Sequence, residues 1–305
     1  MTIITTNDFE IQNESISLQA TASLSFENKK SDLFITADMA IKMQKRADKD
    51  LLVYDKSLAL DKEYENNLLW TKKLKSAISE DRLTPYYQPI VNNVTGEFEK
   101  YECLVRMIDT DGKIISPYFF LDIAKRTKNY IELTKIVIAK SFETFKEMDI
   151  EFSINLTIQD VLDEGLKEFI FSKLKEYNNG NRVVFEIVES EGIENFELII
   201  EFIKDVKEAG CKIAIDDFGT GYSNFEYLLQ LKADYIKIDG SMIKNIDTDS
   251  DARAVVSTIV DFAKKMNMKT IAEFVKDETI DSIIKEMGID YSQGFYFGEP
   301  KPTPN

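Results

Sequence analysis

The stretch from residue 182 to residue 217 reads RVVFEIVESEGIENFELIIEFIKDVKEAGCKIAIDD, and its pattern decides the fold. An apolar, β-branched run (Arg182–Val188) precedes a segment (Glu194–Ala209) whose apolar residues recur at the three- and four-residue spacings of one helix face. Gly210 then ends the predicted helix, and a second apolar run (Lys212–Asp217) follows. This order of strand, helix and strand predicts one unit of a parallel sheet.

The same unit recurs from about Pro85 to the end of the chain, with further helical patterns over Ala252–Met266 and Glu278–Met287. Eight such runs over about 220 residues predict an α/β fold, a TIM-like (β/α)8 barrel, with a doubly wound open sheet as the alternative. Only Asn92–Glu99 separates the first two runs, so these two strands are expected to pair as an antiparallel hairpin. The expected strands are Tyr86–Val91, Lys100–Ile108, Glu151–Leu156, Arg182–Val188, Lys212–Asp217, Tyr235–Asp239, Lys269–Phe274 and Tyr291–Phe297.

The first 56 residues follow a different pattern and predict a small α+β segment. Its pieces are too few to bury a core alone, and a charged helical linker is expected to connect it to the barrel. The expected domains are therefore residues 1–56, the linker 57–80 and the barrel 81–305. The expected elements of the first segment are a strand over Ile16–Phe26, an amphipathic helix over Asp32–Arg46 and a strand over Leu51–Tyr54.

The composition excludes several classes of function. The chain has no histidine, which removes serine–histidine and cysteine–histidine catalysis and histidine-based zinc sites. Its net charge of −16 disfavours a polymeric nucleic acid as partner. The sequence shows neither a run of about 18 apolar residues nor a basic amino-terminal region, so we expect no membrane segment and a cytoplasmic location. Cys103 and Cys211 lie in or beside apolar runs and are expected to be core residues.

Polar residues recur along the predicted strands, several of them towards the strand ends. Carboxyl ends of parallel strands converge on one face of a barrel, where active sites are found. Several acidic groups there would repel one another unless a cation joined them, and oxygen-only ligands favour Mg²⁺ or Mn²⁺ over zinc. Each residue alone could be a surface charge or a turn residue, but their repetition is hard to obtain by coincidence. The residues are Glu102, Asn155, Glu186, Glu189, Asp216, Asp217, Lys237, Asp239, Glu273 and Gln293.

The adjacent pair Asp216 and Asp217 is the most informative of these. Neighbouring strand residues point to opposite faces, but a turn at the strand end could present both carboxylates to two metal ions. Such a pair of ions activates water for phosphodiester cleavage. Lys237 could orient that water or neutralise developing charge, and Glu273 could bind metal or act as a base. Alternatively, Asp216-Asp217-Phe218-Gly219 could be a turn with capping aspartates.

In these residues and in the motifs around them, the chain resembles the EAL domain family. Glu102-Cys103-Leu104-Val105-Arg106 is similar to its signature, with cysteine in place of alanine. Asp216-Asp217-Phe218-Gly219-Thr220-Gly221-Tyr222-Ser223 closely resembles its loop motif. Several further motifs match in order between about Leu83 and Pro302, namely Tyr87-Gln88-Pro89-Ile90, Ser153-Ile154-Asn155-Leu156, Glu186-Ile187-Val188-Glu189-Ser190, Lys237-Ile238-Asp239 and Gln293-Gly294.

The resemblance implies hydrolysis of cyclic di-GMP to linear pGpG with two Mg²⁺ or Mn²⁺ ions, in a homodimer. It implies that Glu189 anchors the loop motif, and that Glu273 binds metal or acts as general base while Lys237 holds the attacking water. Gln88, Arg106 and Gln293 would position substrate or water. The implied metal ligands are Glu102, Asn155, Glu186, Asp216 and Asp217. The family barrel also contains one antiparallel strand, in agreement with the predicted hairpin.

Two features leave alternatives open. Residues 1–56 loosely resemble the carboxyl-terminal part of a GGDEF domain, but the chain has no Gly-Gly-Asp-Glu-Phe motif, so cyclase activity is not expected. The usual Glu-Gly-Val-Glu of the seventh strand is Glu273-Phe274-Val275-Lys276 here. A lysine beside the metals could weaken their binding. Together with the incomplete GGDEF piece, this motivates a second hypothesis, a catalytically silent receptor of cyclic di-GMP. A third is an unrelated metal-dependent barrel enzyme.

Overall fold

The computed structural model describes residues 6–11, 14–19, 22–24, 51–53, 60–127, 129–188, 196–219 and 229–304. The chain divides into two compact units, Met1–Lys72 and Lys73–Asn305. The predicted helix Asp32–Arg46 lies outside the described residues. Among the described helices, none is long and apolar enough to cross a membrane.

Short strands and the first part of a helix form the described part of the first unit. β1 (Thr6–Ile11) pairs antiparallel with β2 (Glu14–Gln19), and β3 (Ala22–Leu24) pairs parallel with β4 (Leu51–Val53). β2, β3 and β4 overlap the two strands predicted for this segment, whereas β1 was not predicted. The helix α2 (Leu60–Ser79) begins in the first unit, ends in the second and occupies most of the predicted linker. The domain boundaries themselves remain predictions.

Eight strands of the second unit close into a barrel, as the sequence predicts. Their order around the barrel is β5-β13-β12-β11-β10-β9-β8-β6, and a pairing between β5 and β6 closes the ring. The open doubly wound sheet is thereby excluded. The short β7 (Ile114–Ile115) pairs antiparallel with the last two residues of β6, beyond the part of β6 that pairs with β8. The barrel strands are β5 (Leu83–Asn92), β6 (Phe98–Ile108), β8 (Glu151–Leu156), β9 (Val183–Val188), β10 (Lys212–Phe218), β11 (Tyr235–Ile238), β12 (Lys269–Ala272) and β13 (Tyr291–Gln293).

One strand of the barrel runs against the others. β5 pairs antiparallel with both β6 and β13, which confirms the hairpin predicted from the short link between the first two strands. The other seven strands are mutually parallel. Their carboxyl ends therefore open on one face of the barrel, the face where a parallel barrel places its active site.

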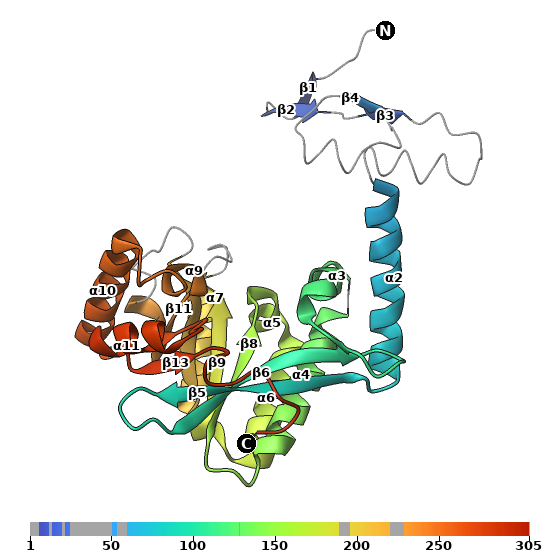
Figure 1. Cartoon of the computed structure of the whole chain (residues 1–305). Coiled ribbons are helices and arrows are strands. Elements are labelled where there is room, and N and C mark those ends of the chain that lie inside the picture. Colours follow the sequence, from blue (N-terminus) through green and yellow to red (C-terminus); the bar gives the residue numbers. More distant parts are fainter. Residues whose placement is uncertain are drawn as a thin grey trace. The chain divides into compact units, whose positions relative to one another are not determined.

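Helices surround the barrel (Figure 1), and the three helical patterns named from the sequence are confirmed to within two residues at each end. Aspartate side chains fix two of the helix starts, because Asp249 and Asp277 accept hydrogen bonds from the first-turn amides of α10 and α11. The described helices that lie wholly in this unit include α3 (Leu121–Arg126), α4 (Tyr130–Phe145), α5 (Ile158–Leu162), α6 (Glu164–Tyr177), α7 (Phe196–Glu208), α9 (Gly240–Ile243), α10 (Ser250–Lys265) and α11 (Glu278–Glu286), with 3-10 turns η2 (Pro117–Phe119) and η3 (Gly180–Arg182).

The core lies on both faces of the strands. In β9 the residues Val183, Phe185 and Ile187 alternate with Val184 and Glu186, and all five are buried. Burial on both sides of the sheet explains why the strands of this barrel read as nearly continuous apolar runs in the sequence.

A polar cluster lies at the amino ends of the barrel strands, on the face opposite the carboxyl ends. Lys100 of β6 forms an ion pair with Glu151 of β8 and donates a hydrogen bond of 2.9 Å to the Tyr235 hydroxyl. The Tyr235 hydroxyl in turn donates to Glu151 at 2.9 Å, and Lys212 also pairs with this carboxylate. The two lysines stabilise the ionised form of Glu151, which burial alone would disfavour.

Two strands end two or more residues earlier than predicted, and backbone packing gives the reason for one of them. Gly294 passes so close to Val275 that a Cβ on the glycine would lie 2.1 Å from the Val275 carbonyl oxygen. The chain turns at this contact, which ends β13 at Gln293 rather than at Phe297. β12 ends at Ala272 rather than at Phe274, so Glu273 stands just beyond the strand.

Candidate active site

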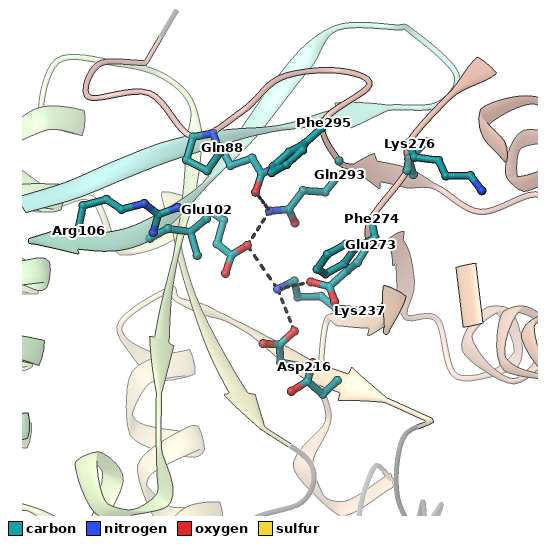
Figure 2. A pocket seen from close by; sticks show the side chains of 15 residues that line it. Gln88, Glu102, Arg106, Asp216, Lys237, Glu273, Phe274, Lys276, Gln293 and Phe295 are labelled. Atoms are coloured by element: carbon teal, nitrogen blue, oxygen red, sulfur yellow. Dashed lines mark hydrogen bonds and ion pairs between the residues drawn. The ribbon is translucent and has the colours of Figure 1, made fainter. Parts of the chain in front are cut away.

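Successive barrel strands bring ten of the eleven predicted site residues to one part of the barrel. Cross-strand register explains several of the encounters, because Gln88 pairs with Glu102 and Asn155 pairs with Glu186. Figure 2 shows the resulting pocket with its labelled side chains. The residues come from β5 (Gln88), β6 (Glu102, Arg106), β8 (Asn155), β9 (Glu186), β10 (Asp216, Asp217), β11 (Lys237), the end of β12 (Glu273) and β13 (Gln293).

Lys237 occupies the centre of the acidic groups, and its side chain is 1% exposed. Its Nζ lies 2.6 Å from a carboxylate oxygen of Glu186, 2.8 Å from Asp216 and 2.9 Å from Glu273. The Glu102 carboxylate lies 3.7 Å from the same nitrogen. One ammonium group thus joins carboxylates from four other strands or strand ends. Figure 2 shows three of these contacts, to Glu102, Asp216 and Glu273. Their attraction raises the pKa of Lys237 well above its ordinary value although burial opposes this, so the lysine stays charged.

The pair Asp216 and Asp217 is presented by an irregularity in β10. The register between β10 and β11 shifts between Ile215 and Phe218, so that one extra residue is accommodated on β10. Asp217 has a φ of 55°, in the left-handed region that a non-glycine residue rarely adopts. This turn of the backbone brings a ligand oxygen of Asp216, Asp217 and Glu273 within 4.8 Å of one another.

Amide side chains orient Glu102. Asn155 Nδ2 donates to one carboxylate oxygen at 2.8 Å, and Gln293 Nε2 donates to the other at 2.6 Å. Gln293 Nε2 also lies 3.1 Å from Gln88 Oε1, while Gln88 Nε2 donates to the Gly298 carbonyl at 3.2 Å. Among the described residues, the buried Oε1 of Gln293 has no hydrogen-bond partner, which leaves an acceptor in the site.

The carboxylates do not all have the same affinity for protons. Burial would raise the pKa of Glu102, but Lys237 and the hydrogen bonds from Gln293 and Asn155 outweigh it, so the net pKa is lowered. Burial raises the pKa of Glu186 well above its ordinary value and that of Glu273 to about 8, despite the attraction of Lys237. Burial and the neighbouring Asp216 raise the pKa of Asp217 as well. The site therefore holds more buried carboxyl groups than one lysine can keep ionised.

The pocket above this cluster has a volume of about 350 Å³. Arg106 lines it, with its guanidinium 5.9 Å from the Tyr86 ring. Phe295 and Pro300 also line it, and neither is among the site residues predicted from the sequence. The available signal was the position of Phe295 directly after the matched Gln293-Gly294 motif.

Lys276 points away from the carboxylates. Its Nζ donates a hydrogen bond of 2.8 Å to the Lys244 carbonyl at the carboxyl end of α9. In Figure 2 its side chain extends to the side opposite Glu273 and Lys237. The reversed charge expected beside the metals is therefore directed elsewhere.

Two sequence expectations fall outside the described residues. Glu189, the expected anchor of the loop motif, lies in the stretch 189–195, and residues 220–223 of the motif itself lie in the stretch 220–228. Asp239, predicted as the last residue of the sixth strand, caps α9 instead, because its side chain accepts a hydrogen bond of 2.9 Å from the Ser241 amide.

A closed barrel with carboxylates, one buried lysine and amides at the strand ends defines a class of acidic, metal-compatible barrel sites. Comparison with known families then identifies the family: the EAL domain matches residues 71–300, and the chain belongs to this family. This excludes the hypothesis of an unrelated barrel enzyme, for which the motif matches would have to be accidental.

Curated relatives and a solved structure are also similar. The chain is 33% identical over 282 residues to the cyclic di-GMP phosphodiesterase PdeB of Shewanella oneidensis, covering 89% of this chain and 33% of that protein. It is 33% identical over 232 residues to the cyclic di-GMP phosphodiesterase PdeA of Borreliella burgdorferi, covering 74% and 35%. The chain thus spans about a third of the length of these relatives. The PaMucR phosphodiesterase in complex with c-di-GMP is 28% identical, with a TM-score of 0.73 over 77% of this chain and 98% of that one.

Proposed function

We propose that this chain hydrolyses cyclic di-GMP to linear pGpG in a reaction that depends on Mg²⁺ or Mn²⁺. The observation that carries the proposal is the set of buried carboxylates around Lys237, in a chain that belongs to the EAL family. The names of PdeB and PdeA and the ligand of the PaMucR structure support cyclic di-GMP as the substrate.

The residues of the site fit divalent cations bound by oxygen. Asp216, Asp217 and Glu273 offer ligand oxygens within 4.8 Å of one another, and Glu102, Glu186 and Asn155 extend the same set. The raised pKa values of Glu186 and Glu273 indicate carboxylates that are short of positive charge, and a cation would supply it. When bound, two such ions would activate the attacking water as Lewis acids and stabilise the leaving oxygen.

The protein side chains would then carry the following steps. Lys237 holds the attacking water, and Glu273 accepts its proton or serves as a further ligand. The water oxygen attacks phosphorus, and the bond from phosphorus to the ribose 3′ oxygen breaks. The leaving 3′ oxygen takes up a proton from solvent and becomes a hydroxyl, so the product carries a 5′ phosphate. Gln88, Arg106 and Gln293 position the substrate, and the free Oε1 of Gln293 is available to accept a hydrogen bond from it. Glu189 would anchor the loop motif.

Further parts of the proposal concern the rest of the chain. The silent-receptor hypothesis was motivated by Lys276 and by the incomplete GGDEF piece. The hydrogen bond from Lys276 to Lys244 weakens the first motive and leaves the second. We propose that the active form is a homodimer, which sedimentation at several protein concentrations would test. We also propose that residues 1–56 are a remnant of a GGDEF domain. If residues 57–305 alone show the same free energy of unfolding and the same turnover as the whole chain, residues 1–56 form a separate domain.

The deciding experiment is turnover by the purified chain. Cyclic di-GMP is incubated with Mg²⁺ or Mn²⁺, with and without chelator, and pGpG is followed by chromatography. Asp216→Ala should abolish the product, whereas Asp261→Asn, which changes an exposed carboxylate of α10, should leave it unchanged. Metal-dependent product that disappears only with Asp216→Ala supports the proposal; binding of cyclic di-GMP without any product would make the chain a receptor.

A further inference from the structure

Phe274 adopts a backbone conformation that favours glycine. Its φ is 55°, in the left-handed region, and its side chain is 70% exposed. Neighbouring hydrogen bonds enforce this geometry, since the Glu273 amide donates to the Ile238 carbonyl at 3.2 Å and the Val275 amide donates to the Gln293 carbonyl at 3.0 Å. An exposed ring on strained backbone contributes little to folding, and such strain is often found at functional sites.

The Phe274 ring is held against Gly240 at the start of α9. A Cβ on Gly240 would lie 2.3 Å from Phe274 Cδ2 and 2.5 Å from Cγ, so the ring rests directly on the glycine backbone. This contact fixes the ring while most of its surface stays open to solvent. The ring therefore combines a defined position with a large free apolar surface.

That surface belongs to the pocket of the candidate active site. Phe274 lines the pocket together with Phe295, which is 69% exposed. Phe274 directly follows Glu273, and Figure 2 shows its ring beside that carboxylate. Planar bases stack on aromatic side chains whatever their sequence, because each base has a flat π face. An aromatic surface next to the phosphate-directed groups thus suits a nucleobase attached to the scissile phosphodiester.

We propose that Phe274 is a specificity-determining residue, whose ring stacks on one purine base of the dinucleotide substrate. This inference rests on the proposed function, since it assigns a base-binding role within the same site. Phe274 replaces the glycine that the family usually has at this position. It would contribute binding that is the same in the ground state and the transition state, because the ring lies beside the reacting groups and not among them.

The test separates binding from chemistry. Phe274→Ala should raise the KM for cyclic di-GMP by about 5- to 150-fold, the range that corresponds to about 1–3 kcal/mol for base stacking, while kcat changes less than about threefold. Phe274→Tyr keeps a ring and should retain the KM, whereas Phe274→Leu keeps apolar volume without a ring and should not. Phe119→Ala, which removes another exposed ring on η2 outside this pocket, is the matched control.

Phe274→Gly distinguishes a lost contact from a damaged fold. Glycine adopts a φ of 55° without strain, so this variant should unfold at a temperature no lower than the unaltered chain and still show the raised KM. Calorimetric titration measures the same loss of binding directly, as a rise in the dissociation constant. Cyclic di-GMP and Mg²⁺ are added to proteins that also carry Glu273→Gln, because this change prevents turnover.

The outcomes separate the two proposals. If the unaltered chain shows no turnover but the calorimetric affinity falls on Phe274→Ala, the proposed activity fails and the stacking role stands. If turnover is present and Phe274→Ala or Phe274→Leu leaves both KM and affinity unchanged, the stacking role is overturned. Loss of affinity in the Phe119→Ala control would overturn it equally, as would failure of the unaltered chain to bind.

Discussion

Replacing Glu273 by glutamine should stabilise the metal-free protein at neutral and alkaline pH. Burial raises the pKa of Glu273 to about 8 from an ordinary value of 4.5, although Lys237 lies 2.9 Å away. The folded state therefore binds this proton more tightly than the unfolded state. The contribution of the group to stability is full below pH 4.5 and is lost as the pH rises towards 8.

The magnitude follows from the two pKa values. Each unit of difference corresponds to about 1.4 kcal/mol, so the loss at pH 7 relative to pH 4.5 has a ceiling of about 3 kcal/mol. Glutamine has nearly the same shape, does not titrate in this range and can still accept a hydrogen bond from Lys237. Its own burial and the weaker contact with the lysine reduce the gain, and we expect about 1–3 kcal/mol at pH 7.

The assay is urea unfolding at 25 °C in the presence of a chelator, from pH 5 to pH 9. The free energies of unfolding of Glu273→Gln and of the unaltered chain should nearly coincide at pH 5 and separate as the pH rises, with equal slopes against urea. Added Mn²⁺ should reduce the difference, because a cation stabilises the carboxylate. Parallel stability curves across the whole pH range, or a variant that is less stable at pH 9, would refute the reasoning.

Three further predictions test other parts of the molecule. Lys237→Met should abolish turnover and lower the free energy of unfolding of the metal-free chain by about 3–5 kcal/mol in urea, because it leaves buried carboxylates without their shared cation. Glu151→Gln, at the opposite end of the barrel, should also destabilise by about 3–5 kcal/mol at pH 7, since it leaves Lys100 buried without its partner. Burial would raise the pKa of Glu151, but the neighbouring lysines lower it; the difference in urea stability should therefore shrink as the pH falls below 4.5. Lys276→Glu should change kcat less than about threefold in a steady-state assay, since its charge is exposed and directed at α9, and a large gain would show that Lys276 acts on the site.

Much of the fold follows from the sequence because the barrel is buried on both sides of its strands. Runs such as Val183–Val188 have to be apolar on both faces, and this distinguishes them from the helices that follow. The short link between β5 and β6 allows only an antiparallel return. Strand ends were less predictable: at Gly294 the chain turns because of a contact with Val275, which no local pattern records.

The sequence by itself determined the strand–helix alternation, the oxygen-only chemistry of the site and the positions of its residues along the strands. These features are local, since each depends on the residue type and its place within one element. Only the tertiary structure decided that Lys237 lies among four carboxylates, that an irregularity in β10 turns Asp216 and Asp217 into one site, and that Lys276 points to α9. Those outcomes depend on closure of the barrel, which sets the distances between groups far apart in the chain and thereby their charges and partners.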